Sequence, residues 1–170
     1  MRVIGIVGWK NNGKTTLVVR LVEHLVARGL SVSTVKHAHH SVELDSEGKD
    51  TWRHRKAGAG EVLLATSKRW VLMHEIGEND EEPPLDRLLE RMTPCDIVVV
   101  EGFKRFPHPK IEVHLQQRGQ PLLARDDPTI VAVASDHPVS IDIPVFDIDD
   151  VAAIAGIALE RAAPAGAFPS

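Results

Sequence analysis

The stretch "GWKNNGKTT", residues 8–16, follows the apolar run "MRVIGIV" at the start of the chain. Gly8, four further residues and then Gly13, Lys14 and Thr15 match the phosphate-binding loop pattern G-x-x-x-x-G-K-[ST]. In such a loop the glycines let successive backbone N–H groups face phosphate oxygens, and the start of the following helix adds its positive end. The lysine supplies a charge to the β and γ phosphates, and the threonine hydroxyl can bind Mg²⁺.

The residues on both sides of this loop fit its function. The run "VIGIVG", residues 3–8, predicts a buried strand, and the apolar residues after Lys14 recur at helical spacing until Gly29. The alternative is a glycine-rich turn before a helix that happens to contain lysine and threonine. Strand, loop and helix in this order favour the nucleotide-binding interpretation.

The bulk composition places the chain among ordinary globular proteins. It has 170 residues, 43% of them hydrophobic, which suffices for one domain with a substantial core. The formal net charge of −4 argues against a non-specific nucleic-acid surface. A single cysteine excludes an intramolecular disulfide framework and fits a reducing compartment. No apolar stretch approaches the roughly 20 residues that span a bilayer, and no secretory signal is evident. We therefore expect a cytoplasmic protein that binds neither membrane nor nucleic acid.

Along the chain, runs rich in Val and Ile alternate with helical patterns, which predicts an α/β fold with a mainly parallel sheet. Two β-like runs around Ser67 and Lys68 are too close for a crossover helix and should form an antiparallel hairpin. We expect one domain over residues 1–160 and a disordered tail over residues 161–170. The other predicted strands cover residues 31–37, 95–102, 110–116 and 129–136, and the other predicted helices cover residues 51–59, 85–92 and 150–162.

A phosphate-binding loop usually needs an acidic residue at the end of another strand to hold the metal. The run "DIVVVEG" offers Asp96 and Glu101, which a strand would separate by roughly 16 Å. Ligands of parallel sheets bind at the carboxyl ends of the strands, where Gly8 also emerges. This geometry favours Glu101 as the Mg²⁺ residue, bound directly or through water.

Three other groups of polar residues suggest further ligands, each with an ordinary alternative. Asp136 ends the run "TIVAVASD" and either reads the two N–H donors of a guanine edge or only forms a turn. The histidines of "KHAHH", residues 36–40, hold a transition metal or make hydrogen bonds and anion contacts in a loop. The basic segment "KDTWRHRK", residues 49–56, captures a second anion or is a solvated helix face.

Taken together, these motifs resemble the MobB family, the molybdopterin-guanine dinucleotide biosynthesis protein B. The resemblance extends in order over nearly the whole chain apart from the tail. One departure lies in the loop, where family members often have Ser-Gly and this chain has Lys10-Asn11-Asn12. The matching stretches are "GKTTL" (13–17), "KHAHH" (36–40), "GKD" (48–50), "RKAGA" (55–59), "RW" (69–70), "EGFK" (101–104), "VASD" (133–136) and "DIDDV" (147–151).

The resemblance implies a P-loop NTPase-like, three-layer α/β fold with a mainly parallel sheet and an added antiparallel hairpin. It also implies a GTP-binding homodimer of molybdenum cofactor maturation that works with a MobA-type nucleotidyltransferase, which joins GMP to molybdopterin. The implied cofactors are GTP and Mg²⁺, with the metal at Thr15 and Glu101. The implied nucleotide-binding residues are Gly8, Asn11, Asn12, Gly13, Lys14, Thr15, Thr16 and Asp136, and the candidates for a second ligand or the dimer cleft are His37, Asp50, Arg55 and Lys104.

The sequence leaves three activities open. No motif supplies the water-orienting glutamine or arginine finger of a fast GTPase, so we expect slow hydrolysis at most. A small-molecule kinase would need a lid over the phosphates, and the long loop over residues 38–49 is acidic and rich in histidine. A metallochaperone GTPase would use the histidine cluster. Whether molybdopterin itself binds is not determined by these motifs.

Overall fold

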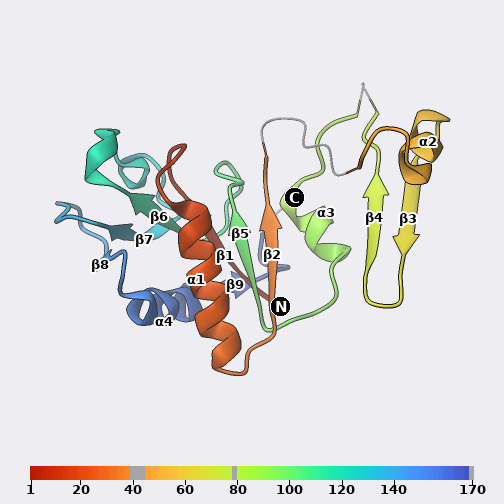
Figure 1. Ribbon diagram of the computed structural model, residues 1–170. Helices are drawn as coiled ribbons and strands as arrows, with labels where there is room; N and C mark the ends of the chain where they lie inside the picture. Colours follow the sequence, from red (N-terminus) through yellow and green to blue (C-terminus); the bar gives the residue numbers. More distant parts are fainter. Residues whose placement is uncertain (39–44, 78–79, 169–170) are drawn as a thin grey trace. The chain divides into compact units, whose positions relative to one another are not determined.

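The computed structural model describes residues 1–38, 45–77 and 80–168 of the chain. These form two compact units, of which the larger comprises Met1–His37 and Pro84–Ser170 and the smaller comprises Ala38–Pro83. The sequence predicts a single domain over residues 1–160, because no linker composition marks the borders of the smaller unit. Each unit is described by itself below, and Figure 1 labels the elements of both.

The larger unit is built on a seven-stranded sheet in which strand β1 has a central place. Five of the six residues of β1 are buried, which explains its apolar sequence. The neighbouring strands along the main path pair in parallel, which confirms the predicted sheet. The order is β2 (Val32–Lys36), β5 (Ile97–Glu101), β1 (Arg2–Val7), β6 (Lys110–His114), β7 (Ile130–Ser135) and β8 (Val145–Asp147), with β9 (Ala163–Pro164) antiparallel to β1.

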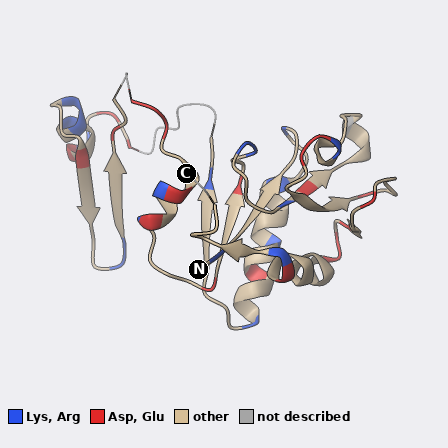
Figure 2. Ribbon diagram, turned by 180° about the vertical axis from the view of Figure 1, so that it is seen from behind, with Lys and Arg blue, Asp and Glu red and all other residues tan. Residues whose placement is uncertain are grey.

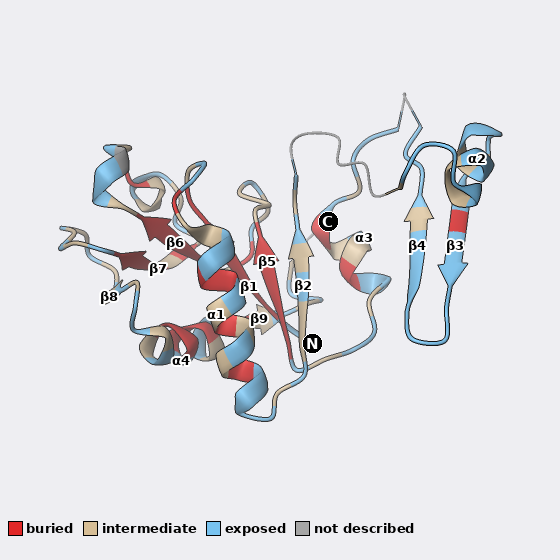
Figure 3. Cartoon of the chain, viewed as in Figure 1, coloured by how far each residue is buried: buried red, intermediate tan, exposed pale blue. Residues whose placement is uncertain are grey.

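Helices cover both faces of this sheet and complete a three-layer fold, as expected. Helices α1 (Lys14–Ala27) and α4 (Val151–Arg161) pack on one face, and the short helix α3 (Leu85–Glu90) packs on the other. Figure 3 shows the buried residues concentrated in the sheet and on the sides of the helices that face it. Two 3₁₀ turns, η1 (Gln116–Arg118) and η2 (Leu123–Arg125), lie between β6 and β7.

Helix α1 begins where the sequence predicts. Gly13, in the left-handed conformation, precedes its first residue, and Gly29, with a φ of 83°, follows the last turn. The buried residues Leu17, Leu21 and Leu25 recur at four-residue spacing and face the sheet. The apolar periodicity therefore determines which side of α1 packs on the sheet. With that side packed, the first turn of α1 lies at the carboxyl ends of the strands.

The C-terminal segment differs from the expected disordered tail. Helix α4 continues to Arg161, and Ala163–Pro164 then pair with the start of β1. The Arg2 guanidinium donates a hydrogen bond of 3.0 Å to the Ala162 carbonyl, and the Phe168 ring meets the Phe106 ring edge-on at 5.5 Å. The tail composition gave no sign of this, because its order comes from contacts with residues far away in the sequence.

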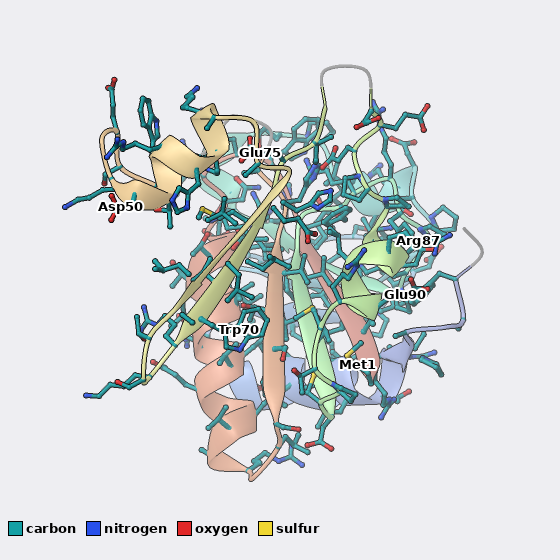
Figure 4. The ribbon with its side chains drawn as sticks, turned by 90° about the vertical axis from the view of Figure 1, so that its right-hand side faces the viewer. Met1, Asp50, Trp70, Glu75, Arg87 and Glu90 are labelled. Atoms are coloured by element: carbon teal, nitrogen blue, oxygen red, sulfur yellow. The ribbon has the colours of Figure 1, made fainter. Side chains whose placement is uncertain are left out.

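The smaller unit contains helix α2 (Asp50–Lys56) and the hairpin of β3 (Glu61–Ala65) and β4 (Trp70–His74). The antiparallel pairing confirms the hairpin that the sequence predicts. Figure 4 labels Asp50, Trp70 and Glu75 in this unit. The Arg55 guanidinium on α2 lies 2.7 Å from the Glu75 carboxylate, which joins the helix to the residue after the hairpin.

Within the described parts of the chain, no helix has both the length and the apolar character needed to cross a membrane.

Candidate phosphate-binding site

The loop over residues 8–13 leaves β1 and enters α1 at the carboxyl edge of the sheet. Gly8 has a φ of 149°, and a Cβ there would lie 2.6 Å from the Val113 carbonyl oxygen of β6. Gly13 and Asn11 are also left-handed, with φ of 79° and 65°. The close approach to β6 therefore requires glycine at position 8, and the two left-handed residues curl the chain toward the start of α1.

Asn12 holds this loop on the sheet. Its side chain is fully buried, and its Nδ2 donates a 3.3 Å hydrogen bond to the Val113 carbonyl. Its backbone N–H donates to the Trp9 carbonyl at 3.3 Å. The sequence assigns Asn12 to the nucleotide through the backbone of the loop, and in the structure its side chain points into the protein. Asn11 and Thr16 are exposed at the loop and in the first turn of α1.

The Lys14 side chain folds back over the loop that precedes it. Its Nζ donates a 2.8 Å hydrogen bond to the Trp9 carbonyl. Burial is the largest cause that lowers the pKa of Lys14, and the ammonium groups of Lys104 and Lys36 lower this pKa further against the opposing effect of Glu101. A bound anion would offset this repulsion, so the surroundings of Lys14 favour phosphate.

Thr15 and Glu101 come together across the sheet. The Thr15 hydroxyl donates a 2.9 Å hydrogen bond to Glu101 Oε1, and only 9% of Glu101 is exposed. Glu101 is the last residue of β5, opposite Ile6 of β1 in the parallel register. Asp96 lies at the other end, where its carboxylate accepts hydrogen bonds from the backbone and hydroxyl of Ser31. The structure thus places Glu101, and not Asp96, beside the loop.

Thr15 and Glu101 together fit a magnesium site. A hydroxyl and a carboxylate are the hard oxygen ligands that Mg²⁺ prefers, usually with several waters and phosphate oxygens completing the octahedron. Among the described residues, no group of three or more His, Cys, Asp or Glu side chains could hold a metal by itself. His39 and His40 of the predicted histidine cluster lie outside the described residues, so the transition-metal hypothesis stays a prediction.

Two more lysines lie at this edge of the sheet, where Figure 2 shows basic segments beside acidic ones. Lys36 ends β2, and its Nζ lies 3.3 Å from Glu101 Oε1. Lys104 Nζ lies 4.8 Å from the centroid of the Trp9 ring, whose Nε1 donates to the Pro121 carbonyl at 2.8 Å. Burial is the main cause that lowers the pKa of Lys104. The edge therefore carries more positive than negative charge, as an anion site requires.

The turn after Glu101 brings two candidates for a second ligand to the same edge. Gly102 and Phe103 are both left-handed, with φ of 99° and 50°, and a Cβ on Gly102 would lie 2.9 Å from the His37 Cβ. The His37 ring stacks on Phe103 with centroids 4.5 Å apart. This tight turn explains the glycine of "EGFK". Lys104 follows Glu101 by three residues, and the His37 backbone N–H donates a 2.8 Å hydrogen bond to the Glu101 carbonyl.

The other two candidates, Asp50 and Arg55, belong to the smaller unit. Asp50 is exposed in the first turn of α2. Arg55 makes ion pairs with Glu75 at 2.7 Å and with Asp45 at 3.5 Å. These contacts within the unit give Arg55 partners of its own, without a ligand.

Asp136 follows β7 at the carboxyl edge, as predicted. Its Oδ1 accepts a 2.9 Å hydrogen bond from the Gln116 backbone N–H and lies 2.9 Å from His137 Nδ1. The first of these contacts is the largest cause that lowers the pKa of Asp136, followed by the hydrogen bond from His137. The carboxylate is therefore held charged and in place, and it is exposed to solvent.

A pocket of about 390 Å³ lies at the ends of β6 and β7, which the sequence did not reveal. His114, the last residue of β6, lines it and is only 8% exposed, and His114 Nδ1 has no hydrogen-bond partner. Gln120, Arg125 and His137 also line it. Because Val113 packs toward α1, the alternation of strand residues turns His114 to the opposite face of the sheet. The signal in the sequence that could have indicated this pocket is a polar residue, His114, at the end of a strand.

Comparison with known proteins identifies the family. The family model described as "Molybdopterin guanine dinucleotide synthesis protein B" (MobB) matches residues 3–136. The chain belongs to the MobB family. Its MobB relatives include the "Molybdopterin-guanine dinucleotide biosynthesis adapter protein" of Haemophilus influenzae, 42% identical over 89% of this chain and 84% of that one. The protein of the same name from Escherichia coli is 39% identical over 89% of this chain and 88% of that one.

Solved MobB structures share the fold. The crystal structure of Bacillus subtilis MobB aligns with a TM-score of 0.74 at 25% identity and covers 95% of this chain and 98% of that chain. A crystal structure of molybdopterin-guanine biosynthesis protein B aligns with a TM-score of 0.71 at 29% identity and covers 93% of this chain and 98% of that chain. The predicted family and the predicted fold class are both confirmed.

Proposed function

We propose that this MobB protein is a GTP-binding accessory protein of molybdenum cofactor biosynthesis. It would assist the conversion of molybdopterin to molybdopterin guanine dinucleotide by a MobA-type nucleotidyltransferase. The observation that carries the nucleotide proposal is the contact between Thr15 and Glu101 directly beside Lys14. The printed names of the H. influenzae and E. coli relatives support the biosynthetic role.

In this proposal the phosphates lie on the loop between Gly8 and Thr15, against the first turn of α1. The N–H groups of that turn lack helical partners and can donate to phosphate oxygens. Lys14 would exchange its hydrogen bond to the Trp9 carbonyl for a β or γ phosphate oxygen. Mg²⁺ held by Thr15 and Glu101 would neutralise phosphate charge and orient the γ phosphate.

The guanine base would be read by Asp136. Guanine presents adjacent N1–H and N2–H donors that one carboxylate accepts in a bidentate manner, and adenine lacks this pair. The Gln116 N–H and His137 hold Oδ1 of Asp136 in a defined position, which pre-organises the carboxylate for this role.

Replacing Asp136 with alanine should therefore remove the preference for GTP over ATP, a loss of about ten-fold or more for two charge-assisted hydrogen bonds. Titration of purified protein with GTP and with ATP, with and without Mg²⁺, measures this change. Asp142→Ala is the matched control, because Asp142 is an exposed aspartate on the loop that follows the Asp136 region. Equal affinities for GTP and ATP in the unaltered protein would contradict the guanine assignment.

The same titration extends to the second ligand. A pterin carries hydrogen-bonding edges on a planar ring, and the pocket beside His114 and Gln120 offers buried polar atoms without partners, His114 Nδ1 and Gln120 Oε1. The pocket volume of about 390 Å³ is within the range of small-molecule sites. His37 and Lys104 are the other candidates at this edge. Pterin-6-carboxylate, which is fluorescent and anionic, serves as the probe for molybdopterin binding.

Slow hydrolysis fits the surroundings of the magnesium site. Among the described residues, the side-chain hydrogen bonds and ion pairs of the Thr15 hydroxyl and the Glu101 carboxylate join these two groups to each other and to Lys36. A fast GTPase would place a water-orienting glutamine or an arginine there. We propose that the isolated protein turns over GTP slowly at most.

We propose further that the protein forms a homodimer through the hairpin. Leu63, Trp70 and Leu72 share one face of β3–β4 by the antiparallel register, and 59%, 62% and 40% of them are exposed. We call these three residues the apolar hairpin face. A two-stranded hairpin is marginally stable alone, and exposed apolar surface of this kind marks an interaction site. A second copy of the chain is the occupant that the family resemblance implies.

Trp70→Ser should convert the dimer to a monomer of 18.7 kDa, which light scattering after size-exclusion chromatography measures directly. Val26→Ser, which removes an exposed apolar side chain from α1 (53% exposed), should leave the dimer intact. A monomer in the unaltered protein, or a dimer that survives Trp70→Ser together with Leu72→Ser, would contradict this interface. The Trp70 variant also tests the other possible occupant of this face, because loss of binding to the MobA-type partner would show that the partner uses the same residues.

A further inference from the structure

Three atoms meet at the edge of the sheet where the magnesium site is proposed. Lys36 Nζ lies 3.3 Å from Glu101 Oε1 and 3.5 Å from the Thr15 hydroxyl, and these two oxygens are themselves 2.9 Å apart. The Lys36 ammonium therefore contacts both groups that fit the metal. The register explains why, since Lys36 of β2 lies directly opposite Glu101 of β5.

The ammonium and a divalent cation would compete for one oxygen. Glu101 Oε1 is the atom that both Thr15 and Lys36 contact. A magnesium ion binds carboxylate oxygens at about 2.0–2.1 Å and demands near-octahedral geometry, which leaves no room for an ammonium on the same lone pairs. The two cations therefore exclude each other at Oε1.

The side chains differ in how easily they can move. The Glu101 side chain is 12% exposed and fixed at the end of a central strand, whereas the Lys36 side chain is 60% exposed at the end of β2. A lysine ammonium sits on a flexible four-carbon stem, so it can swing a few ångströms without disturbing the core. Lys36 can leave Glu101 while Glu101 and Thr15 stay in place.

We propose that Lys36 is a tethered cation that occupies the magnesium position of the nucleotide-binding site until Mg²⁺ displaces it. The inference rests on the proposed function. Without metal, the Lys36 ammonium neutralises Glu101 and faces the incoming phosphates, so the protein retains nucleotide in the absence of Mg²⁺. With metal, Mg²⁺ neutralises Glu101 and the exposed Lys36 side chain moves away into solvent. The device keeps the site charge-balanced in both states and reduces, without removing, the dependence of nucleotide affinity on Mg²⁺.

Lys36→Met tests this inference by the binding of a fluorescent GDP analogue in EDTA and across a Mg²⁺ titration. The dissociation constant in EDTA should rise about ten-fold or more, since a charge-assisted contact to phosphate is lost, whereas the value at saturating Mg²⁺ should change by less than about three-fold. The Mg²⁺ concentration at the midpoint should fall, because the metal no longer competes with an ammonium. Because the Lys36 side chain is largely exposed, the variant should have the melting temperature of the unaltered protein.

Lys104→Met is the matched control, because it removes the same charge from the same edge but its ammonium lies over the Trp9 ring. It should weaken binding by similar factors in EDTA and in Mg²⁺ and leave the Mg²⁺ midpoint unchanged. The inference would be overturned if Lys36→Met had the same ratio of dissociation constants in EDTA and in Mg²⁺, and the same Mg²⁺ midpoint, as the unaltered protein. Failure of the unaltered protein to bind nucleotide in either condition would instead overturn the proposed function.

Discussion

Replacing Lys14 with alanine is expected to weaken GTP binding at least about 100-fold, because a charge buried against the phosphates is lost together with its hydrogen bonds. Lys14 is the lysine of the phosphate loop, and burial, followed by the neighbouring ammonium groups, lowers its pKa. Its Nζ contacts only the loop carbonyl of Trp9 among the hydrogen bonds of the described residues. The side chain therefore contributes little to the fold and much to anion binding.

Isothermal titration with GTP and Mg²⁺ measures the loss, and thermal unfolding shows whether the fold survives. Lys10→Ala is the matched control, since Lys10 is an exposed lysine of the same loop. It should bind GTP within about three-fold of the unaltered protein, as expected for a solvated charge. Full-strength binding by the Lys14 variant with an intact fold would refute the phosphate site.

Glu101→Gln is expected to abolish the gain in nucleotide affinity that Mg²⁺ provides. Glutamine keeps an oxygen that accepts the Thr15 hydrogen bond but loses the negative charge that holds the metal. In EDTA the variant should bind nucleotide at least as well as the unaltered protein, because one negative charge beside the phosphates is gone. Lys36→Met should change the same Mg²⁺ dependence in the opposite direction.

The measurement is the ratio of dissociation constants in EDTA and in Mg²⁺, which should fall close to one in Glu101→Gln. Asp96→Asn makes the same chemical change at the far end of the same strand, where the carboxylate bonds Ser31. It should keep the ratio of the unaltered protein, even if it lowers the melting temperature. A retained Mg²⁺ gain in Glu101→Gln would show that another group holds the metal.

The choice of Glu101 over Asp96 was available from the sequence because it needs only the direction of a parallel strand. Gly8 leaves a strand at its carboxyl end, and Glu101 ends another strand that the alternation of elements makes parallel to it. The structure confirms this placement by the contact between Thr15 and Glu101. The same argument correctly put Asp136 at the same edge.

The sequence missed features that depend on contacts between distant residues. The loop motif does not show that the side-chain amide of Asn12 bonds the Val113 carbonyl of β6. Strand β8 is three residues long and not fully buried, so no apolar pattern marked it. The order of Ala163–Pro164 depends on pairing with β1. No pattern in the neighbouring sequence indicates these three features, because each depends on which strand lies beside the segment in the folded sheet.

The sequence by itself determined the strand, loop and helix around Lys14, the parallel sheet, the hairpin and the family. These depend on backbone preferences and on periodicities that a few neighbouring residues carry, such as glycine at positive φ and leucines one turn apart. Only the tertiary structure decided that Lys36 meets Thr15 and Glu101, and that His114 turns into a pocket on the opposite face. Those contacts depend on strand order and register, because the packing of the whole sheet brings together residues that are far apart in the chain.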